Sequence, residues 1–176
     1  MEAFTPISPE AFTPNRSVDQ VELNKNAPEF DDWSGLLQLL RSEFLYTQGL
    51  VSPPSTVFEL SETDLKQRAE KENLLLGLVD GQPVACLFFN ELPDKLFLGR
   101  FAIASHFRGR GLARKMVGVA EAHARSLGLS VLELETRVNL TVNQVKFCAL
   151  GFKICGGRAH EGYESQTTLT LRMSII

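Results

Sequence analysis

The chain has 176 residues, a formal net charge of −3 and 44% hydrophobic residues, values typical of one globular domain with its own core. This charge provides no basic field that would attract nucleic acid or an anionic membrane. No apolar run approaches the roughly 18 residues of a membrane-spanning helix, and no secretory signal is visible. The cysteines, Cys86, Cys148 and Cys155, form no C-x-x-C pair and no metal-ligand spacing with the three histidines. We therefore expect a cytoplasmic protein without a metal site.

The N-terminal segment contains one pentapeptide twice, as Glu2-Ala3-Phe4-Thr5-Pro6 and as Glu10-Ala11-Phe12-Thr13-Pro14. Two copies are too few for a repeat architecture. Four prolines up to Pro28 favour an extended or mobile tail. We expect a flexible tail over residues 1–15 and a single domain over residues 16–176. The tail is either a dispensable arm or a segment that docks on a partner subunit.

The first half of the domain predicts two helices and a series of antiparallel strands. An imperfect alternation of apolar and polar residues over Arg16–Asn24 predicts a weak first strand. Asp31 and Asp32 open a helix with a hydrophobic stripe, and a shorter helix ends at Lys71. Tight turns then separate three apolar segments and predict a meander, with strands over Asn73–Val79, Pro83–Asn90 and Leu96–Ala104.

The second half predicts alternating helices and strands. Apolar residues recur at helical spacing over Gly111–Leu127, and Gly128 follows as a C-terminal stop. A strand, a helix and two strands come next, over Val131–Thr136, Thr141–Leu150, Phe152–Cys155 and Thr167–Ser174. A strand, a long helix and another strand form a right-handed βαβ crossover. The sequence therefore predicts an α/β fold, with a mixed sheet that is antiparallel first, parallel in the middle and covered by helices on both faces.

One turn between a predicted strand and the long helix carries chemistry. Arg108-Gly109-Arg110-Gly111-Leu112-Ala113 places two glycines and two arginines where the helix begins. The first N–H groups of a helix lack intrahelical partners, and the helix dipole adds partial positive charge there. Gly109 and Gly111 let an anion approach the backbone, and Arg108 and Arg110 can add charge from the flanks. The turn therefore predicts a site for a diphosphate.

Three kinds of phosphate-binding turn compete for this stretch. A dinucleotide fingerprint needs a third glycine where Arg114 stands. A P-loop needs Lys and then Ser or Thr after its last glycine, and Leu112 and Ala113 do not supply them. The pattern R-x-x-G-x-A remains, and Arg108–Ala113 matches it.

With this pattern, the chain resembles bacterial-type members of the GCN5-related N-acetyltransferase family, and the resemblance extends over roughly Leu74 to Ser174. The strand Leu98–Ala104 and the later stretch Phe147-Cys148-Ala149-Leu150-Gly151-Phe152 also carry the resemblance. It implies that two parallel strands splay apart and that the pantetheine arm of acetyl-CoA enters the gap, where it pairs with backbone like an added strand. Phe101, Ala102 and Ile103 would offer those backbone groups, one of which would polarise the thioester carbonyl. The alternative for this strand is an ordinary core strand.

Direct transfer to an amine needs a proton acceptor and a donor for the departing thiolate. Glu133 and Glu135 alternate along their strand and share one face. The resemblance implies that Glu135 removes the amine proton; the alternative is a solvated or salt-bridged sheet face.

Many family members carry a tyrosine, the general acid, at the position of Phe147, and phenylalanine cannot donate a proton. Tyr163 is then a candidate acid or acceptor contact, with His160 as a further acceptor-side candidate. The resemblance also makes Phe147 part of the coenzyme site and Asn143 a ligand of the pantetheine arm; Asn143 is alternatively a helix cap.

The resemblance as a whole implies an enzyme that moves an acetyl group from acetyl-CoA to a primary amine by direct attack. The acceptor is a small molecule or a peptide, with neither nucleic acid nor membrane as a partner, and family habit makes a homodimer plausible. The alternative is an acyl-CoA sensor or interaction module that keeps the coenzyme site without transferase activity.

Overall fold

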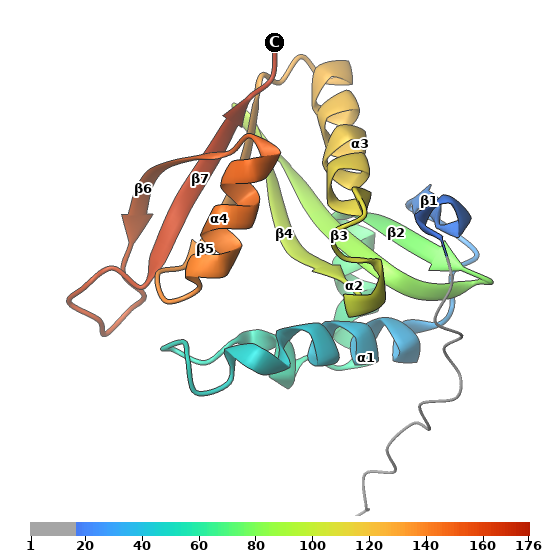
Figure 1. Cartoon of the computed structure of the whole chain (residues 1–176), viewed down its shortest axis with the longest axis horizontal. Coiled ribbons are helices and arrows are strands. Elements are labelled where there is room, and N and C mark those ends of the chain that lie inside the picture. The colour runs from blue at the N-terminus through green and yellow to red at the C-terminus, as the bar shows by residue number, and fades with distance from the viewer. Residues whose placement is uncertain (1–16) are drawn as a thin grey trace, which may run out of the picture.

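The computed structural model describes residues 17–176, so the repeated pentapeptide and the whole of the expected tail lie outside the described residues. Seven strands form one sheet in the order β1-β2-β3-β4-β5-β7-β6 (Figure 1). The strands are β1 Glu22–Lys25, β2 Asn73–Val79, β3 Gln82–Leu92, β4 Lys95–Ile103, β5 Val131–Arg137, β6 Lys153–Arg158 and β7 Thr168–Ser174. The α-helices are α1 Trp33–Phe44, α2 Glu62–Lys71, α3 Leu112–Ser126 and α4 Thr141–Leu150. Within the described range, no helix is long and apolar enough to cross a membrane.

The predicted first strand is wrong over its first half. Val18–Gln20 form a 3₁₀ turn that Ser17 caps, and β1 begins only at Glu22. The Ser17 hydroxyl accepts a hydrogen bond from the Asp19 N–H, and this bond stabilises the turn relative to an extended chain. Val18 nevertheless reaches the core, because the turn buries its side chain.

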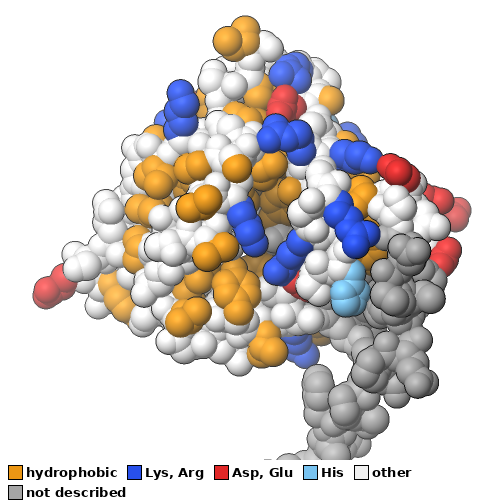
Figure 2. All heavy atoms as spheres, in the orientation of Figure 1, with side chains coloured by type: hydrophobic (Ala, Val, Ile, Leu, Met, Phe, Trp, Pro, Cys, Tyr) orange, Lys and Arg blue, Asp and Glu red, His pale blue; other side chains and the backbone are white. Residues whose placement is uncertain are grey.

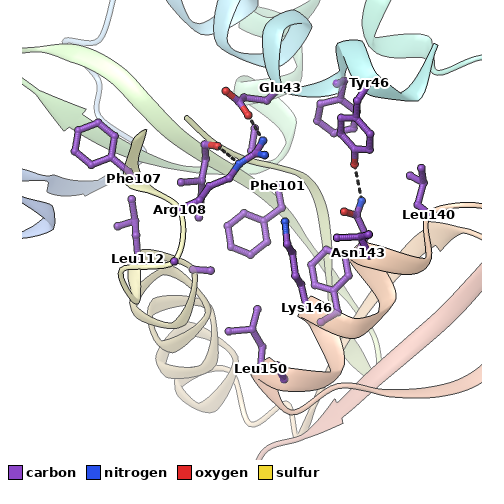
Figure 3. Close-up of a pocket in the computed structure, with 18 of the residues that line it drawn as sticks. Glu43, Tyr46, Phe101, Phe107, Arg108, Leu112, Leu140, Asn143, Lys146 and Leu150 are labelled. Carbon is purple, nitrogen blue, oxygen red and sulfur yellow. Dashed lines mark hydrogen bonds and ion pairs between the residues drawn. The ribbon is translucent and has the colours of Figure 1, made fainter. Parts of the chain in front are cut away.

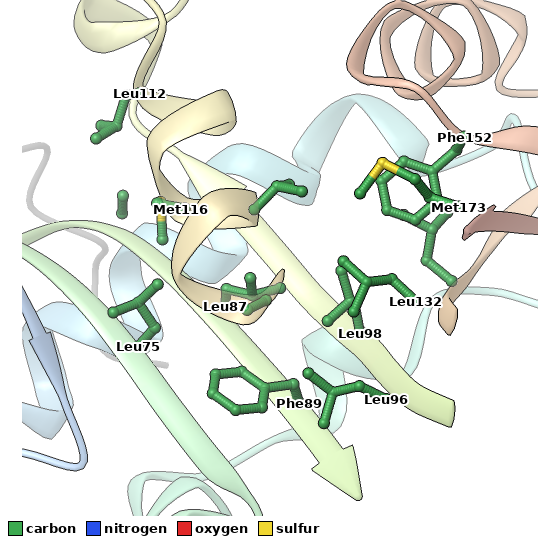
Figure 4. Close-up of a cluster of buried hydrophobic side chains, with 14 of the residues drawn as sticks. Leu75, Leu87, Phe89, Leu96, Leu98, Leu112, Met116, Leu132, Phe152 and Met173 are labelled. Atoms are coloured by element: carbon green, nitrogen blue, oxygen red, sulfur yellow. The ribbon is translucent and has the colours of Figure 1, made fainter. Parts of the chain in front are cut away.

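The mixed sheet with helices on both faces is confirmed. The long apolar runs of β2 and β3 are buried on both sides, because successive side chains point to opposite faces. Leu75, Leu87 and Phe89 join one cluster with α3 (Figure 4), and Leu74, Leu76 and Phe88 join another with α1 and α2. The sheet is therefore the middle layer of three.

The parallel strands β4 and β5 are paired over only part of their length and then diverge. Their register runs over only three pairs, from Leu96↔Leu132 to Leu98↔Leu134. Beyond this point β4 continues along β3 to Ile103, and β5 continues along β7 to Arg137. The β3–β4 register shifts beside the divergence, where one residue between Cys86 and Phe88 of β3 faces two residues between Gly99 and Ala102 of β4, and such bulges bend and twist strands. The expected splay is thus present in the fold.

Candidate active site

A cavity of about 660 Å³ lies where β4 separates from β5. Four parts of the chain enclose it: the end of α1 with the segment after it, the end of β4, the turn before α3, and α4. Figure 2 shows this face of the molecule, on which basic side chains border a hollow with a hydrophobic floor. The predicted coenzyme residues among its lining are Phe101, Ala102, Ile103, Arg108, Gly109, Gly111, Leu112, Ala113, Asn143 and Phe147. Arg110, from the same turn, is not part of the lining.

The turn before α3 needs glycine for its backbone conformation. Gly109 has φ 70°, and Gly111 has φ 83° at the N-cap position of α3. No heavy atom lies within 4 Å of a Cβ built on either residue, so the space in front of the turn is open. An L side chain strains this left-handed backbone, whereas glycine adopts it freely. The turn therefore presents the first N–H groups of α3 to an unobstructed space.

Arg108 lines the cavity, but its charge is already paired. Its Nη2 donates to Glu43 of α1, and its Nε donates to the Ile103 carbonyl at 3.0 Å (Figure 3). Glu43 also accepts from the Ser105 N–H at 3.2 Å. The expected flanking charge of Arg108 is thus neutralised, and its side chain fastens the end of β4 to α1. An anion at this turn would meet mainly backbone N–H groups and the helix dipole.

Two basic residues on the cavity wall were missed in the sequence analysis. Lys146 of α4 points into the space between α3 and α4 (Figure 3), and Arg114 of α3 donates to the Ala149 carbonyl at 2.9 Å. Helical spacing could have found Lys146, because residues 143, 146, 147 and 150 share one face of α4.

Asn143 and Phe147 lie on the wall of the cavity, one helical turn apart. The Phe147 ring packs against Phe101 and Phe152, at centroid distances of 6.4 and 6.2 Å. Asn143 Nδ2 donates to the Tyr46 hydroxyl at 2.8 Å, which brings Tyr46 from the segment after α1 to the start of α4. The cavity is therefore lined by a phenol after all, but Tyr46 supplies it rather than a tyrosine at position 147.

The two predicted catalytic residues do not line this cavity. Both oxygens of Glu135 accept hydrogen bonds from Arg158, at 2.9 and 2.7 Å, and this pairing raises the pKa of the Arg158 guanidinium. The Tyr163 hydroxyl lies 2.8 Å from Ser52 Oγ, in the segment that follows α1. Both strand acids are therefore ion-paired in this structure, since Glu133 likewise pairs with Lys95 and Arg172.

The fold and the cavity are those expected of an acyltransferase that uses a nucleotide coenzyme, and comparison with known proteins shows the family. The model of the acetyltransferase (GNAT) family matches residues 33–152, well over half of the chain, so the chain belongs to this family. It is an acyl-CoA-dependent acetyltransferase with acetyl-CoA as its co-substrate. No group of His, Cys, Asp and Glu among the described residues could hold a metal ion. No curated protein sequence matches the chain significantly.

Solved structures share the fold. A GNAT family acetyltransferase from Elizabethkingia anophelis with acetyl-CoA bound has TM-score 0.62 and 15% identity, covering 89% of this chain and 99% of that chain. The PaiA N-acetyltransferase from Thermoplasma acidophilum in complex with coenzyme A has TM-score 0.70 and 15% identity, covering 87% and 99%. The ribosomal-protein-S18-alanine N-acetyltransferase from Escherichia coli has TM-score 0.62 and 15% identity, covering 88% and 94%.

Proposed function

We propose that the protein transfers the acetyl group of acetyl-CoA to a primary amine by direct attack. One observation carries this proposal: a single cavity joins the glycine turn at the start of α3 to the gap between β4 and β5. Such a cavity has the parts that a long, anionic thioester needs, namely an anion site at one end and an unpaired strand edge at the other.

The coenzyme would occupy the cavity along its length. The diphosphate would accept hydrogen bonds from the backbone of residues 109–113, with Lys146 as a nearby cation. The pantetheine arm would lie along Phe101–Ile103, because the β4–β5 ladder ends at Leu98 and leaves this edge of β4 available. Two of the solved relatives were obtained with acetyl-CoA and with coenzyme A, which supports a coenzyme in this fold.

The chemistry needs one proton acceptor and one proton donor. In the proposed reaction the neutral amine attacks the thioester carbonyl, a C–N bond forms, the C–S bond breaks, and the departing thiolate takes a proton. We assign the donor to Tyr46, because its hydroxyl reaches the cavity beside Asn143, one turn from Phe147. Glu135 remains our candidate for the acceptor, through a water molecule, and its action requires that the Arg158 pair opens. Tyr163 then serves as a contact for the acceptor amine.

A matched pair of tyrosine variants tests these roles. We expect Tyr46→Phe to lower kcat by about 10²-fold at neutral pH, within the range of general acid catalysis, and Tyr163→Phe to raise KM for the amine instead. Glu135→Gln should lower kcat while coenzyme A binds as before. Thiol release across a panel of amines measures turnover, and calorimetry with coenzyme A measures binding.

The two readouts also separate the alternatives. Unchanged kcat in Tyr46→Phe would remove Tyr46 from the mechanism, and unchanged kcat in Glu135→Gln would do the same for Glu135. Coenzyme binding without thiol release on any amine would contradict the transfer reaction and favour an acyl-CoA sensor.

A further inference from the structure

A cluster of charged and polar side chains lies at the end of β5, next to the cavity and outside the coenzyme site. Arg137, the last residue of β5, donates from Nη1 to His160 Nδ1 at 3.2 Å. Burial, followed by the charges of Arg137 and Arg158, lowers the pKa of His160, so the imidazole is neutral at neutral pH. Arg137 therefore donates to an uncharged partner.

The positive charges in this cluster outnumber the negative one. Glu135 is the carboxylate here, and both of its oxygens are occupied by Arg158. Within residues 17–176, Arg137 forms no ion pair with a carboxylate. Its guanidinium is half-buried, and this burial is the main cause of its lowered pKa. A half-buried cation without an anion is costly unless a ligand compensates it.

A buried hydroxyl without a hydrogen-bond partner lies beside Arg137 on the neighbouring strand. Thr168 of β7 is the register partner of Arg137, so the two side chains share one face of the sheet. The Oγ1 atom of Thr168 is buried and lacks a hydrogen-bond partner among the described residues. Buried hydroxyls normally have a partner, so an unsatisfied one beside an unpaired guanidinium indicates a place for an acceptor of hydrogen bonds.

The cluster borders the mouth of the cavity. Residues Asn139 and Leu140, directly after β5, line the cavity, and Gln144 of α4 donates to the Arg137 and Val138 carbonyls, at 3.3 and 3.0 Å. On the other side, the β6–β7 loop reaches the segment after α1 through the Tyr163–Ser52 contact (Figure 1). The Arg137 side chain does not line the cavity, but it contacts the β6–β7 loop through His160, while its backbone carbonyl is held by α4 on the cavity wall. In our proposal the acceptor passes this side chain on its way to the thioester.

Exposed apolar side chains form part of the cavity wall near this cluster. Leu50 and Val142 line the cavity with 55% and 63% of their surfaces exposed. Exposed apolar side chains around an opening favour a ligand with an apolar substituent.

We infer that Arg137 binds a carboxylate of the acceptor, so that the acceptor is a small amine bearing a carboxylate and an apolar side chain, such as an apolar amino acid. This inference rests on the proposed function for its chemistry. A guanidinium recognises a carboxylate through two parallel N–H···O bonds, and an amide of the same shape loses the charged part of that interaction. Simple alkylamines and polyamines lack the group altogether.

Binding of product pairs tests the inference without relying on turnover. N-acetyl-L-leucine and N-acetyl-L-phenylalanine are each titrated, beside their C-terminal primary amides, into protein saturated with coenzyme A. We expect the acids to bind at least about tenfold more tightly than the amides, as a charge-assisted hydrogen bond predicts. In Arg137→Gln this ratio should fall to near one with unchanged affinity for coenzyme A, and Arg137→Lys should restore part of it.

Arg172→Gln is the matched control, because it removes another sheet arginine, the partner of Glu133, and should keep the ratio. A ratio near one in the unaltered protein, or a ratio that survives Arg137→Gln, would overturn the inference. A preserved acid preference without acetyl transfer would contradict the proposed function alone. Equal transfer to amino acids and to their amides would leave the function standing and remove the carboxylate site.

Discussion

At the scale of single residues, the site depends on backbone shape more than on side-chain charge. Gly111 turns the chain with φ 83° directly before α3, while Arg108 is held by Glu43. Gly111 therefore keeps the turn unstrained and leaves the approach to the N–H groups open, and a Cβ at this position would disturb both.

Alanine substitutions at Gly111 and Gly118 compare a glycine that the turn requires with a glycine inside a helix. We expect Gly111→Ala to lower the free energy of unfolding by about 1 kcal/mol, because the left-handed backbone is strained with a side chain. We also expect weaker coenzyme A binding, because the strained turn would no longer present its N–H groups to the proposed diphosphate site in the same way. Gly118, inside α3 with open space around it, is the control. Equal coenzyme affinity in Gly111→Ala and Gly118→Ala would show that the anion does not approach this turn.

The cysteines differ in reactivity because they differ in burial. Burial raises the pKa of the Cys86 thiol to about 12, whereas Cys148 and Cys155 are exposed. In native protein at pH 8 we expect a disulfide reagent to modify only the two exposed thiols, and Cys86 to react after unfolding. Modification of all three thiols at the rate of a free cysteine would contradict this burial.

The same thiol makes stability depend on pH. In the unfolded chain Cys86 ionises near its ordinary pKa of about 8.5, whereas the folded protein keeps it neutral until about pH 12. Its contribution to stability is thus fully present below pH 8.5 and is lost as the pH rises toward 12. Cys86→Ala should show a shallower loss of stability over this range, measured by denaturant unfolding.

At the scale of elements, polar contacts add to apolar packing in positioning α4 and α1. Helix α4 has no buried residue, and Asn143, Gln144 and the Arg114–Ala149 contact fasten it to the rest of the fold. Asp32 caps the N-terminus of α1, where its carboxylate accepts from the Gly35 N–H at 2.9 Å.

The cap of α1 explains a glycine inside a helix. A Cβ on Gly35 would lie 2.2 Å from the Asp32 carboxylate, so alanine there displaces the cap, whereas a Cβ on Gly118 meets open space. We expect Gly118→Ala to raise the free energy of unfolding by about 0.5–1 kcal/mol. Gly35→Ala should show no gain, because loss of a cap costs about 1 kcal/mol. Similar gains for both variants in thermal melts would mean that the cap contributes little.

At the scale of the whole molecule, the sheet holds two hydrophobic clusters and one gap. The clusters cover its two faces, but only three residue pairs join β4 to β5. The coenzyme would fill the space beyond these pairs and connect the antiparallel first half to the strands that follow α3.

Coenzyme binding should therefore stabilise the entire fold. At a coenzyme A concentration 100-fold above Kd, we expect about 2.7 kcal/mol of added stability, seen as a higher Tm. Pantetheine, which lacks the diphosphate, should have a much smaller effect at the same concentration. Equal shifts for both compounds would place the binding energy in the gap rather than at the glycine turn.

The sequence by itself determined most of the elements and the glycine turn before α3, because both follow from local rules. Side-chain period and turn residues predicted Asn73–Val79, Val131–Thr136 and Thr141–Leu150, which the structure confirms to within one residue. The two glycines that the sequence places before the long helix do form its N-terminal turn, where both adopt positive φ. The prediction of the first strand was wrong over its first half, because the turn capped by Ser17 is favoured there over the extended chain that the imperfect apolar–polar alternation indicated.

Only the tertiary structure decided which side chains meet. The contacting residues are far apart in the sequence. Arg108 and Glu43 are separated by 65 positions, Asn143 and Tyr46 by 97, and Arg158 and Glu135 by 23. Local periodicity gives the face on which a residue stands, but not the distant segment that packs against this face. The charge of Arg108, the phenol in the cavity and the unpaired Arg137 therefore became visible only when the splayed sheet brought these segments together.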